Sequence, residues 1–88
     1  MEAEYLNLLY YCYSRIEDPE LFREQHHLKC LELNLKGRII VASEGLNGTV
    51  SGLRADCEQY MKDVQSDPRF SHVEFKVESV PDHTFTKL

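Results

Sequence analysis

The sequence predicts one small α+β domain with its elements in the order strand, helix, strand, strand, helix, strand. Three observations support this prediction. The chain has 88 residues, the size of a single small domain. Its apolar fraction of 42% is ordinary for a globular protein. Two segments with helix-start or helix-stop signals alternate with runs rich in branched and aromatic residues.

The N-terminal part of the chain is predicted to form a strand and then a helix. Residues 6–13 are rich in leucine and tyrosine and apolar on both faces, as expected of a central strand. The helix begins at Asp18-Pro19, because aspartate can cap free backbone N–H groups and proline suits the first helical position. Asn34 is expected to end it in the left-handed conformation.

The buried face of this first helix is predicted from the spacing of its apolar residues. Leu21, Leu28 and Leu31 fall on one stripe, with Phe22 and Cys30 near its border. The sequence therefore predicts that the three leucines face the core.

The middle of the chain is predicted to form a strand, a turn and a second strand. Residues 38–42 carry a run of branched side chains that suits a buried strand. Residues 43–48 are predicted to form the turn, with Asn47-Gly48 adopting positive φ. Residues 49–51 then return as a short strand.

The C-terminal part is predicted to form the second helix and the fourth strand. The apolar face of this helix comprises Leu53, Cys57, Tyr60, Met61 and Val64. It ends at Asp67-Pro68, because the residue before a proline avoids helical angles. In the strand at 72–79, one face is predicted to be buried, and it carries Val73, Phe75 and Val77.

This order of elements predicts a ferredoxin-like, acylphosphatase-like β-α-β-β-α-β sandwich. Two interleaved right-handed crossovers place both helices on one face of a four-stranded antiparallel sheet. The other face of the sheet is left open unless something covers it. We assign residues 1–80 to this domain and residues 81–88 to an exit segment that leads to a further domain absent from this chain.

Charge and cysteine content limit the classes of function. The formal net charge of -5 disfavours autonomous, charge-driven binding of nucleic acid. There is neither a signal peptide nor an apolar run long enough to span a membrane, so we expect a cytoplasmic protein. Three widely separated cysteines without a CxxC pair predict reduced thiols rather than disulfides or a metal site.

One histidine has the spacing of a metal ligand. His26 and Cys30 are four residues apart on the first helix and could face one metal. Two ligands without a second pair make a poor site. We therefore expect a solvated His26 beside a buried Cys30, and no metal or cofactor in this domain.

Domains of this plan can bind RNA when aromatic residues line the two central strands. Tyr10, Tyr11 and Tyr13 lie on the first strand, but residues 49–51 contain no aromatic side chain. Together with the acidic net charge, the absence of aromatic residues at 49–51 favours the interpretation that the three tyrosines pack in the core and its rim.

The segment Gly48-Thr49-Val50-Ser51-Gly52 resembles the end of the acylphosphatase signature. Acylphosphatase chemistry also needs an arginine and a cradle of backbone N–H groups before the first helix, and an asparagine on the second strand. Arg15 is present, but no glycine-rich cradle surrounds it. Residues 42–44 (Ala-Ser-Glu) stand near the position of the asparagine, which favours a likeness of shape only.

Residues 37–52 as a whole closely resemble the N-terminal domain of the rhodanese-related tRNA uridine hydroxylase family. Residues 9–11, 16–20 and 83–87 agree with this resemblance. It implies that the full-length protein is an oxidoreductase that uses molecular oxygen to form 5-hydroxyuridine at the tRNA wobble position. It also implies that the catalytic cysteine lies in a following rhodanese domain, so Cys12, Cys30 and Cys57 are not assigned this role.

The resemblance implies an accessory domain that positions substrate, with the rhodanese domain and tRNA as partners and no catalytic residue of its own. The candidate substrate contacts lie on loops at the strand ends: Arg15, Lys36, Arg38, Glu44 and Asn47. Glu44 could instead cap N–H groups of its own turn. The alternatives are a free-standing protein-interaction module that uses the open sheet face or a strand edge, and then an acylphosphatase-type hydrolase.

Overall fold

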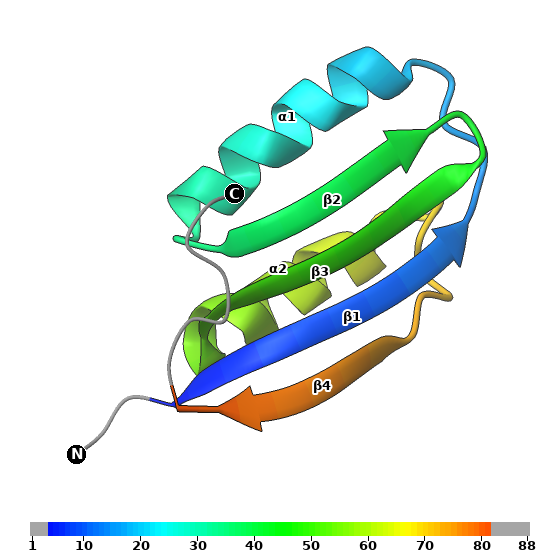
Figure 1. The fold of residues 1–88 in the computed structure, drawn as a ribbon. Helices are drawn as coiled ribbons and strands as arrows, with labels where there is room; N and C mark the ends of the chain where they lie inside the picture. The colour runs from blue at the N-terminus through cyan, green and yellow to red at the C-terminus, as the bar shows by residue number, and fades with distance from the viewer. Residues whose placement is uncertain (1–3, 82–88) are drawn as a thin grey trace.

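The computed structural model describes residues 4–81 and contains the six elements in the predicted order (Figure 1). They are β1 (Tyr5–Tyr13), α1 (Pro19–Glu32), β2 (Lys36–Ala42), β3 (Gly45–Leu53), α2 (Arg54–Ser66) and β4 (Phe75–Val80). The antiparallel sheet has the order β2-β3-β1-β4 and carries both helices on one face. This confirms the predicted ferredoxin-like class. The predicted exit segment lies outside the described residues from position 82 onward.

Helix α1 begins and ends where its local signals predict. The Asp18 carboxylate accepts a hydrogen bond from the Leu21 N–H at 3.1 Å, and Pro19 is the first helical residue. After the helix, Asn34 has a φ of 56°. Leu35 is buried and packs as the apolar clip beyond this left-handed residue.

The predicted buried stripe of α1 is wrong. Leu21, Leu28 and Leu31 are 49%, 58% and 52% exposed, whereas the buried residues of the helix are His26 and Cys30. Large rings from the sheet and α2 already fill the space beneath α1. The small thiol of Cys30 and the hydrogen-bonded imidazole of His26 fit above these rings. The three leucines are left on the opposite face of the helix.

A chain of hydrogen-bonded polar groups runs through the core and explains the burial of His26. The Tyr10 and Tyr60 hydroxyls form a hydrogen bond, and the Tyr60 hydroxyl lies 2.6 Å from His26 Nε2. Burial lowers the pKa of His26 to about 4 and raises the pKa of both tyrosines. The imidazole is therefore neutral at pH 7, and its Nε2 can accept a hydrogen bond from the Tyr60 hydroxyl. The expectation of a solvated His26 is corrected.

The turn between β2 and β3 is shorter than predicted. Only Ser43 and Glu44 form it, and β3 begins at Gly45, which has a φ of 152°. A glycine is required there because a Cβ at this position would lie 2.0 Å from the Cys12 carbonyl oxygen. The predicted turn residues at 47–48 instead belong to the strand.

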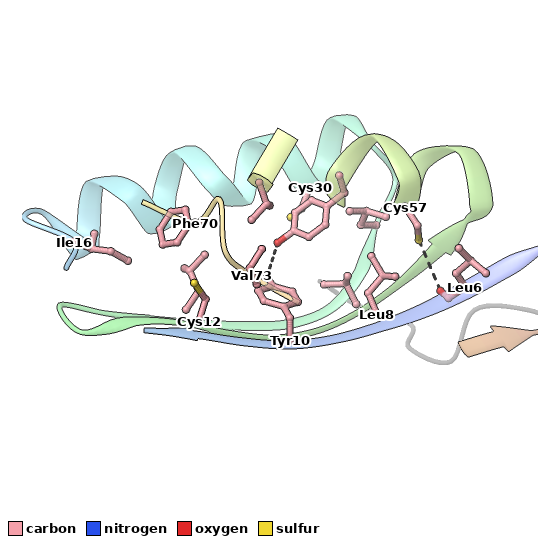
Figure 2. Packing of buried hydrophobic residues seen from close by; sticks show 14 residues of the cluster. Leu6, Leu8, Tyr10, Cys12, Ile16, Cys30, Cys57, Phe70 and Val73 are labelled. Atoms are coloured by element: carbon pink, nitrogen blue, oxygen red, sulfur yellow. Dashed lines mark hydrogen bonds between the residues drawn. The ribbon is translucent and has the colours of Figure 1, made fainter. Parts of the chain in front are cut away.

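Gly48 has a packing role rather than a turn role. It is paired with Tyr10 in the sheet, and a Cβ on Gly48 would lie 2.5 Å from the Tyr10 ring. The missing side chain lets this ring lie over the strand and reach Tyr60. Figure 2 shows Tyr10 among the buried residues between the sheet and the helices.

The predicted apolar face of α2 is confirmed at its three buried residues. Cys57, Tyr60 and Val64 face the core. Leu53 is 37% exposed, because it is the last residue of β3 rather than part of the helix.

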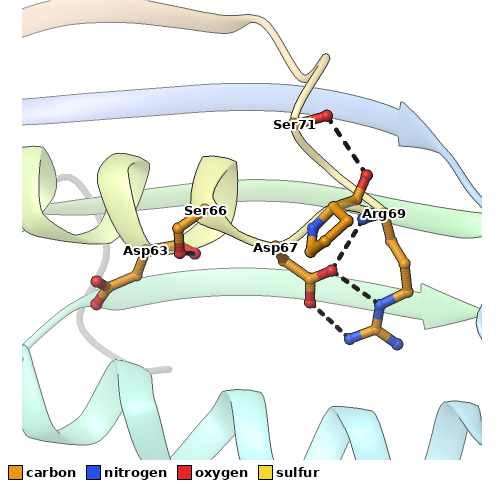
Figure 3. A network of polar contacts seen from close by, with 6 residues as sticks. Asp63, Ser66, Asp67, Arg69 and Ser71 are labelled. Carbon is orange, nitrogen blue, oxygen red and sulfur yellow. Dashed lines mark hydrogen bonds and ion pairs between the residues drawn. The ribbon is translucent and has the colours of Figure 1, made fainter.

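Helix α2 ends at the predicted position. Asp67 follows it with extended angles, as expected before a proline. Its carboxylate accepts hydrogen bonds from the Arg69 backbone N–H at 2.9 Å and from Arg69 Nη2 at 2.7 Å. Figure 3 shows these contacts holding the turn that leads away from the helix.

Strand β4 is shorter and less covered than predicted. It begins at Phe75, and Val73 is buried in the segment before it. Val77 is 49% exposed, although it is paired with the buried Leu8. Because β4 is an edge strand and α2 packs mainly on β3 and β1, the helices described here cover this part of the inner face less than the centre of the sheet.

Candidate nucleic-acid interface on the open sheet face

The sheet face turned away from the helices carries two rows of side chains that are fixed by strand register. Residues directly opposite one another in an antiparallel sheet share a face. One row crosses all four strands and contains Arg38, Thr49, Leu9 and Lys76. The next row contains Ile40, Asn47 and Tyr11.

We call these two rows, with Tyr13, the open-face patch. Its large apolar members are exposed: Leu9 is 40%, Ile40 51%, Tyr11 54% and Tyr13 67% exposed. Of the three tyrosines expected to pack in the core and its rim, only Tyr10 is buried. A cluster of exposed apolar groups on one face is typical of an interaction surface.

The patch combines rings, cations and an amide. The Tyr11 and Tyr13 rings lie 4.7 Å apart, edge to face. Interaction with the Tyr13 side chain raises the pKa of Tyr11, so this ring is neutral at pH 7. Among residues 4–81, no ion pair uses Arg38 or Lys76, which stand at opposite ends of their row. Both cations are thus available to contact phosphates, and the two rings can stack on bases.

A hollow of about 550 Å³ lies within this face. Leu9, Tyr11, Asn47, Glu74 and Lys76 contribute to its walls. Glu44 lies beside the adjoining hollow that Tyr11 and Asn47 also line. The two carboxylates make the local charge mixed. Binding of RNA here would therefore depend on ring stacking more than on net charge.

The structure brings together some of the five predicted contact residues. Arg38 and Asn47 belong to the open-face patch, and Lys36 lies further along the same face of β2. Glu44 lies in the adjoining turn, where its backbone carbonyl accepts a hydrogen bond from the Ser14 N–H. Arg15 stands apart, in a hollow of about 450 Å³ that Asp18 and Arg69 also line.

Sequence reasoning did not name six members of the patch as contacts: Leu9, Tyr11, Tyr13, Ile40, Thr49 and Lys76. The alternation of residues along β1 and β2 carries the relevant signal. Because both faces of β1 are apolar, that alternation alone does not reveal which face is open.

The loop before α1 does not offer a free phosphate cradle. The Ser14 N–H donates to the Glu44 carbonyl oxygen, and the Ile16 N–H donates to the Ser43 carbonyl oxygen, both at 2.9 Å. These amides are already engaged in holding the loop to the β2–β3 turn. Two donors next to Arg15 that a phosphate cradle could use are therefore already engaged.

The three cysteines are buried, and burial shapes their chemistry. It raises the pKa of Cys12, and it raises the pKa of Cys30 to about 12 and that of Cys57 to about 11. Protonated thiols are weak nucleophiles at neutral pH. The sequence did not predict that Cys12 Sγ lies 3.4 Å from His72 Nε2.

Within residues 4–81, no three side chains that could bind a metal ion lie close together. Neither helix of this part of the chain is long and apolar enough to cross a membrane.

The fold and the open face define a ferredoxin-like domain of the acylphosphatase-like class. A family model described as UPF0176 acylphosphatase like domain matches residues 5–88, and the chain belongs to this family. The chain is 62% identical over 85 residues to a tRNA uridine(34) hydroxylase of Cytophaga hutchinsonii. This match covers 97% of the chain and 27% of that protein. It is 48% identical over 88 residues to a protein of the same name from Bacillus licheniformis, again covering 27% of the relative.

A solved structure shares the fold. The chain superposes on BlrB, a BLUF protein in its dark state, with a TM-score of 0.74 and 22% identity. The match covers 97% of this chain and 68% of that one. At this identity the likeness concerns the fold alone. The chain spans about a quarter of the length of the curated relatives that it matches.

Proposed function

We propose that this chain is the accessory domain of a tRNA uridine(34) hydroxylase that forms 5-hydroxyuridine at the wobble position. The observation that carries the proposal is the 62% identity, over nearly the whole chain, to a relative of that name. In this proposal the catalytic cysteine belongs to a rhodanese domain elsewhere in the cytoplasmic full-length protein. The domain described here supplies neither catalytic residue nor cofactor, and it helps to present the anticodon.

The open-face patch is the surface that we assign to tRNA. The unpaired bases of an anticodon loop can stack on exposed rings, and Tyr11 and Tyr13 offer such rings. Arg38 and Lys76 stand where phosphates on either side of a stacked base can be contacted. The buried, protonated cysteines support a role in positioning rather than in chemistry.

Deleting the domain tests the accessory role. The full-length enzyme and a version without residues 1–80 are compared for wobble hydroxylation by mass spectrometry of tRNA nucleosides. We expect the deletion to lower hydroxylation strongly, because substrate positioning is lost. Equal hydroxylation by the two proteins would sink the proposal.

Substitutions in the full-length enzyme test the surface. Loss of one stacked base contact weakens binding by about 1–3 kcal/mol, so Tyr11→Ala should raise the Kd for tRNA by about 5- to 150-fold. Tyr11→Phe keeps the ring and should bind nearly as the parent does. Lys62→Ala, on the exposed surface of α2, is the matched control. An unchanged Kd for Tyr11→Ala would remove the open face from the proposal.

A further inference from the structure

Glu44 is the acidic member of the small hollow that adjoins the open-face patch. This hollow has a volume of about 160 Å³, and Tyr11, Ile40 and Asn47 also line it. Sites that take a whole drug-sized molecule usually have about 300–1,000 Å³. The hollow can therefore hold only part of a larger ligand, such as one ring. The exposed Tyr11 side chain forms one of its walls.

The turn between β2 and β3 holds the Glu44 carboxylate near this wall. The Glu44 backbone carbonyl accepts a hydrogen bond from the Ser14 N–H at 2.9 Å, which fixes the turn against the end of β1. Interaction with the Tyr13 side chain and, less strongly, the charge of Glu44 raise the pKa of Tyr11, so the carboxylate lies near that ring. Within residues 4–81, neither an ion pair nor a side-chain hydrogen bond engages the carboxylate.

Asn47 supplies a second polar group beside the same ring. It is paired with Tyr11 on one side and with Ile40 on the other, so its side chain lies on the open sheet face. Its exposed amide group has N–H donors and a carbonyl acceptor, whereas the carboxylate of Glu44 only accepts. Together the two side chains can present one donor beside two acceptors.

Among the four RNA bases, guanine alone matches this set of groups. Its Watson–Crick edge carries the O6 acceptor and then the N1–H and N2–H donors. A carboxylate can accept both N–H groups while an amide N–H donates to O6, which is the pattern that cytosine offers to guanine. Adenine and cytosine each place an acceptor nitrogen beside one amino group, and the N3–H of uracil lies between two carbonyl oxygens. Those acceptors repel a carboxylate.

We propose that Glu44 and Asn47 select an unpaired guanine of the anticodon loop, whose ring stacks on Tyr11. The inference rests on the proposed function, because it takes the open face as the surface that contacts tRNA. It gives a role to a carboxylate on that surface, where a carboxylate that met only phosphates would weaken binding. Arg38 and Lys76, at the ends of their row, remain available for the phosphates.

Changes of base in the RNA test the selection of guanine by the full-length enzyme. Anticodon stem-loop RNAs keep uridine at the wobble position, and every other loop position carries guanine, inosine or adenine in turn. Inosine lacks only the N2 amino group of guanine, so it loses one hydrogen bond to a charged acceptor. We expect one loop position at which inosine raises the Kd by about 10-fold or more. Equal Kd values for guanine and inosine at all positions would overturn the proposal.

Glu44→Gln tests whether the carboxylate is responsible for this preference. The new amide keeps one acceptor and adds a donor, a pair of groups that suits adenine rather than guanine. We expect the ratio of the Kd values for guanine and adenine to shift by about 10-fold or more toward adenine. Glu58→Gln makes the same change of charge on the exposed surface of α2 and should keep the ratio of the parent. A ratio that Glu44→Gln leaves unchanged, or that both variants shift equally, contradicts the assignment.

Tyr11→Ala separates failure of this inference from failure of the proposed surface. Because stacking tolerates every base, this variant should weaken binding of the guanine, inosine and adenine RNAs alike. If Tyr11→Ala weakens binding but no loop position prefers guanine, the selection by Glu44 and Asn47 is wrong and the open face stays in place. If Tyr11→Ala binds all three RNAs as the parent does, both are wrong.

Discussion

Acidification should destabilise this domain through one buried residue. His26 is 9% exposed and is held against the Tyr60 hydroxyl, in a place where a charged imidazole is poorly solvated. Its pKa is lowered to about 4 in the folded state from an ordinary value of 6.5. Between these two values the unfolded chain binds a proton that the folded chain does not.

The sign and size of the effect follow from this difference. Because the folded pKa is depressed, the stabilisation is fully present above pH 6.5 and is lost as the pH falls toward 4. Each pH unit within the window changes the free energy of unfolding by about 1.4 kcal/mol. Between pH 8 and pH 5 the loss should therefore be about 2 kcal/mol. Ordinary carboxyl groups titrate mostly below this range.

Urea unfolding of the chain at pH 8 and at pH 5 measures the effect. His26→Gln removes the titrating group, so the difference between the two pH values should shrink by about 2 kcal/mol even if the variant is less stable overall. His27→Gln changes the exposed neighbour and should keep the full difference. An undiminished difference in His26→Gln would refute the reasoning.

Two further substitutions probe how the fold is built. Gly48→Ala forces a methyl group against the Tyr10 ring, so we expect a loss of about 1–3 kcal/mol in urea unfolding; a loss no greater than that of the neighbouring Thr49→Ala would contradict the packing role. Asp18→Ala removes the N-cap of α1 and should cost about 1 kcal/mol in the same assay. Glu17 does not cap the helix, so Glu17→Ala is the control. If Glu17→Ala lowers stability as much as Asp18→Ala, the N-cap role of Asp18 is contradicted.

The order of the elements follows from the sequence because its signals are local. Asp18-Pro19 starts α1, and Asp67 before a proline ends α2, by short-range effects that do not depend on the rest of the fold. The inner face of α1 was mispredicted because it depends on distant partners. Leucines are more apolar than His26 and Cys30, and only the hydrogen bond from Tyr60 and the limited space beneath the helix reverse the expected orientation.

The open-face patch could be predicted only in part for a similar reason. A strong local signal for positive φ at Asn47-Gly48 obscured the fact that β3 runs through these residues. With the strand extended back to Gly45, the register places Asn47 between Ile40 and Tyr11. The sequence supplied Arg38 and Asn47 as candidate contacts. Their neighbours on adjoining strands became evident only from cross-strand pairing.

The central place of β1 has a consequence for synthesis on the ribosome. This strand is made first, yet Tyr5 is paired with Leu53 on one side and with Val80 on the other. Pairings so distant in sequence form late, because the intervening chain must be closed before they contribute. The edge of β1 that pairs with β4 therefore stays unpaired until β4 has left the exit tunnel. In a longer polypeptide this domain would fold as soon as that strand emerges, while the remainder is still being translated.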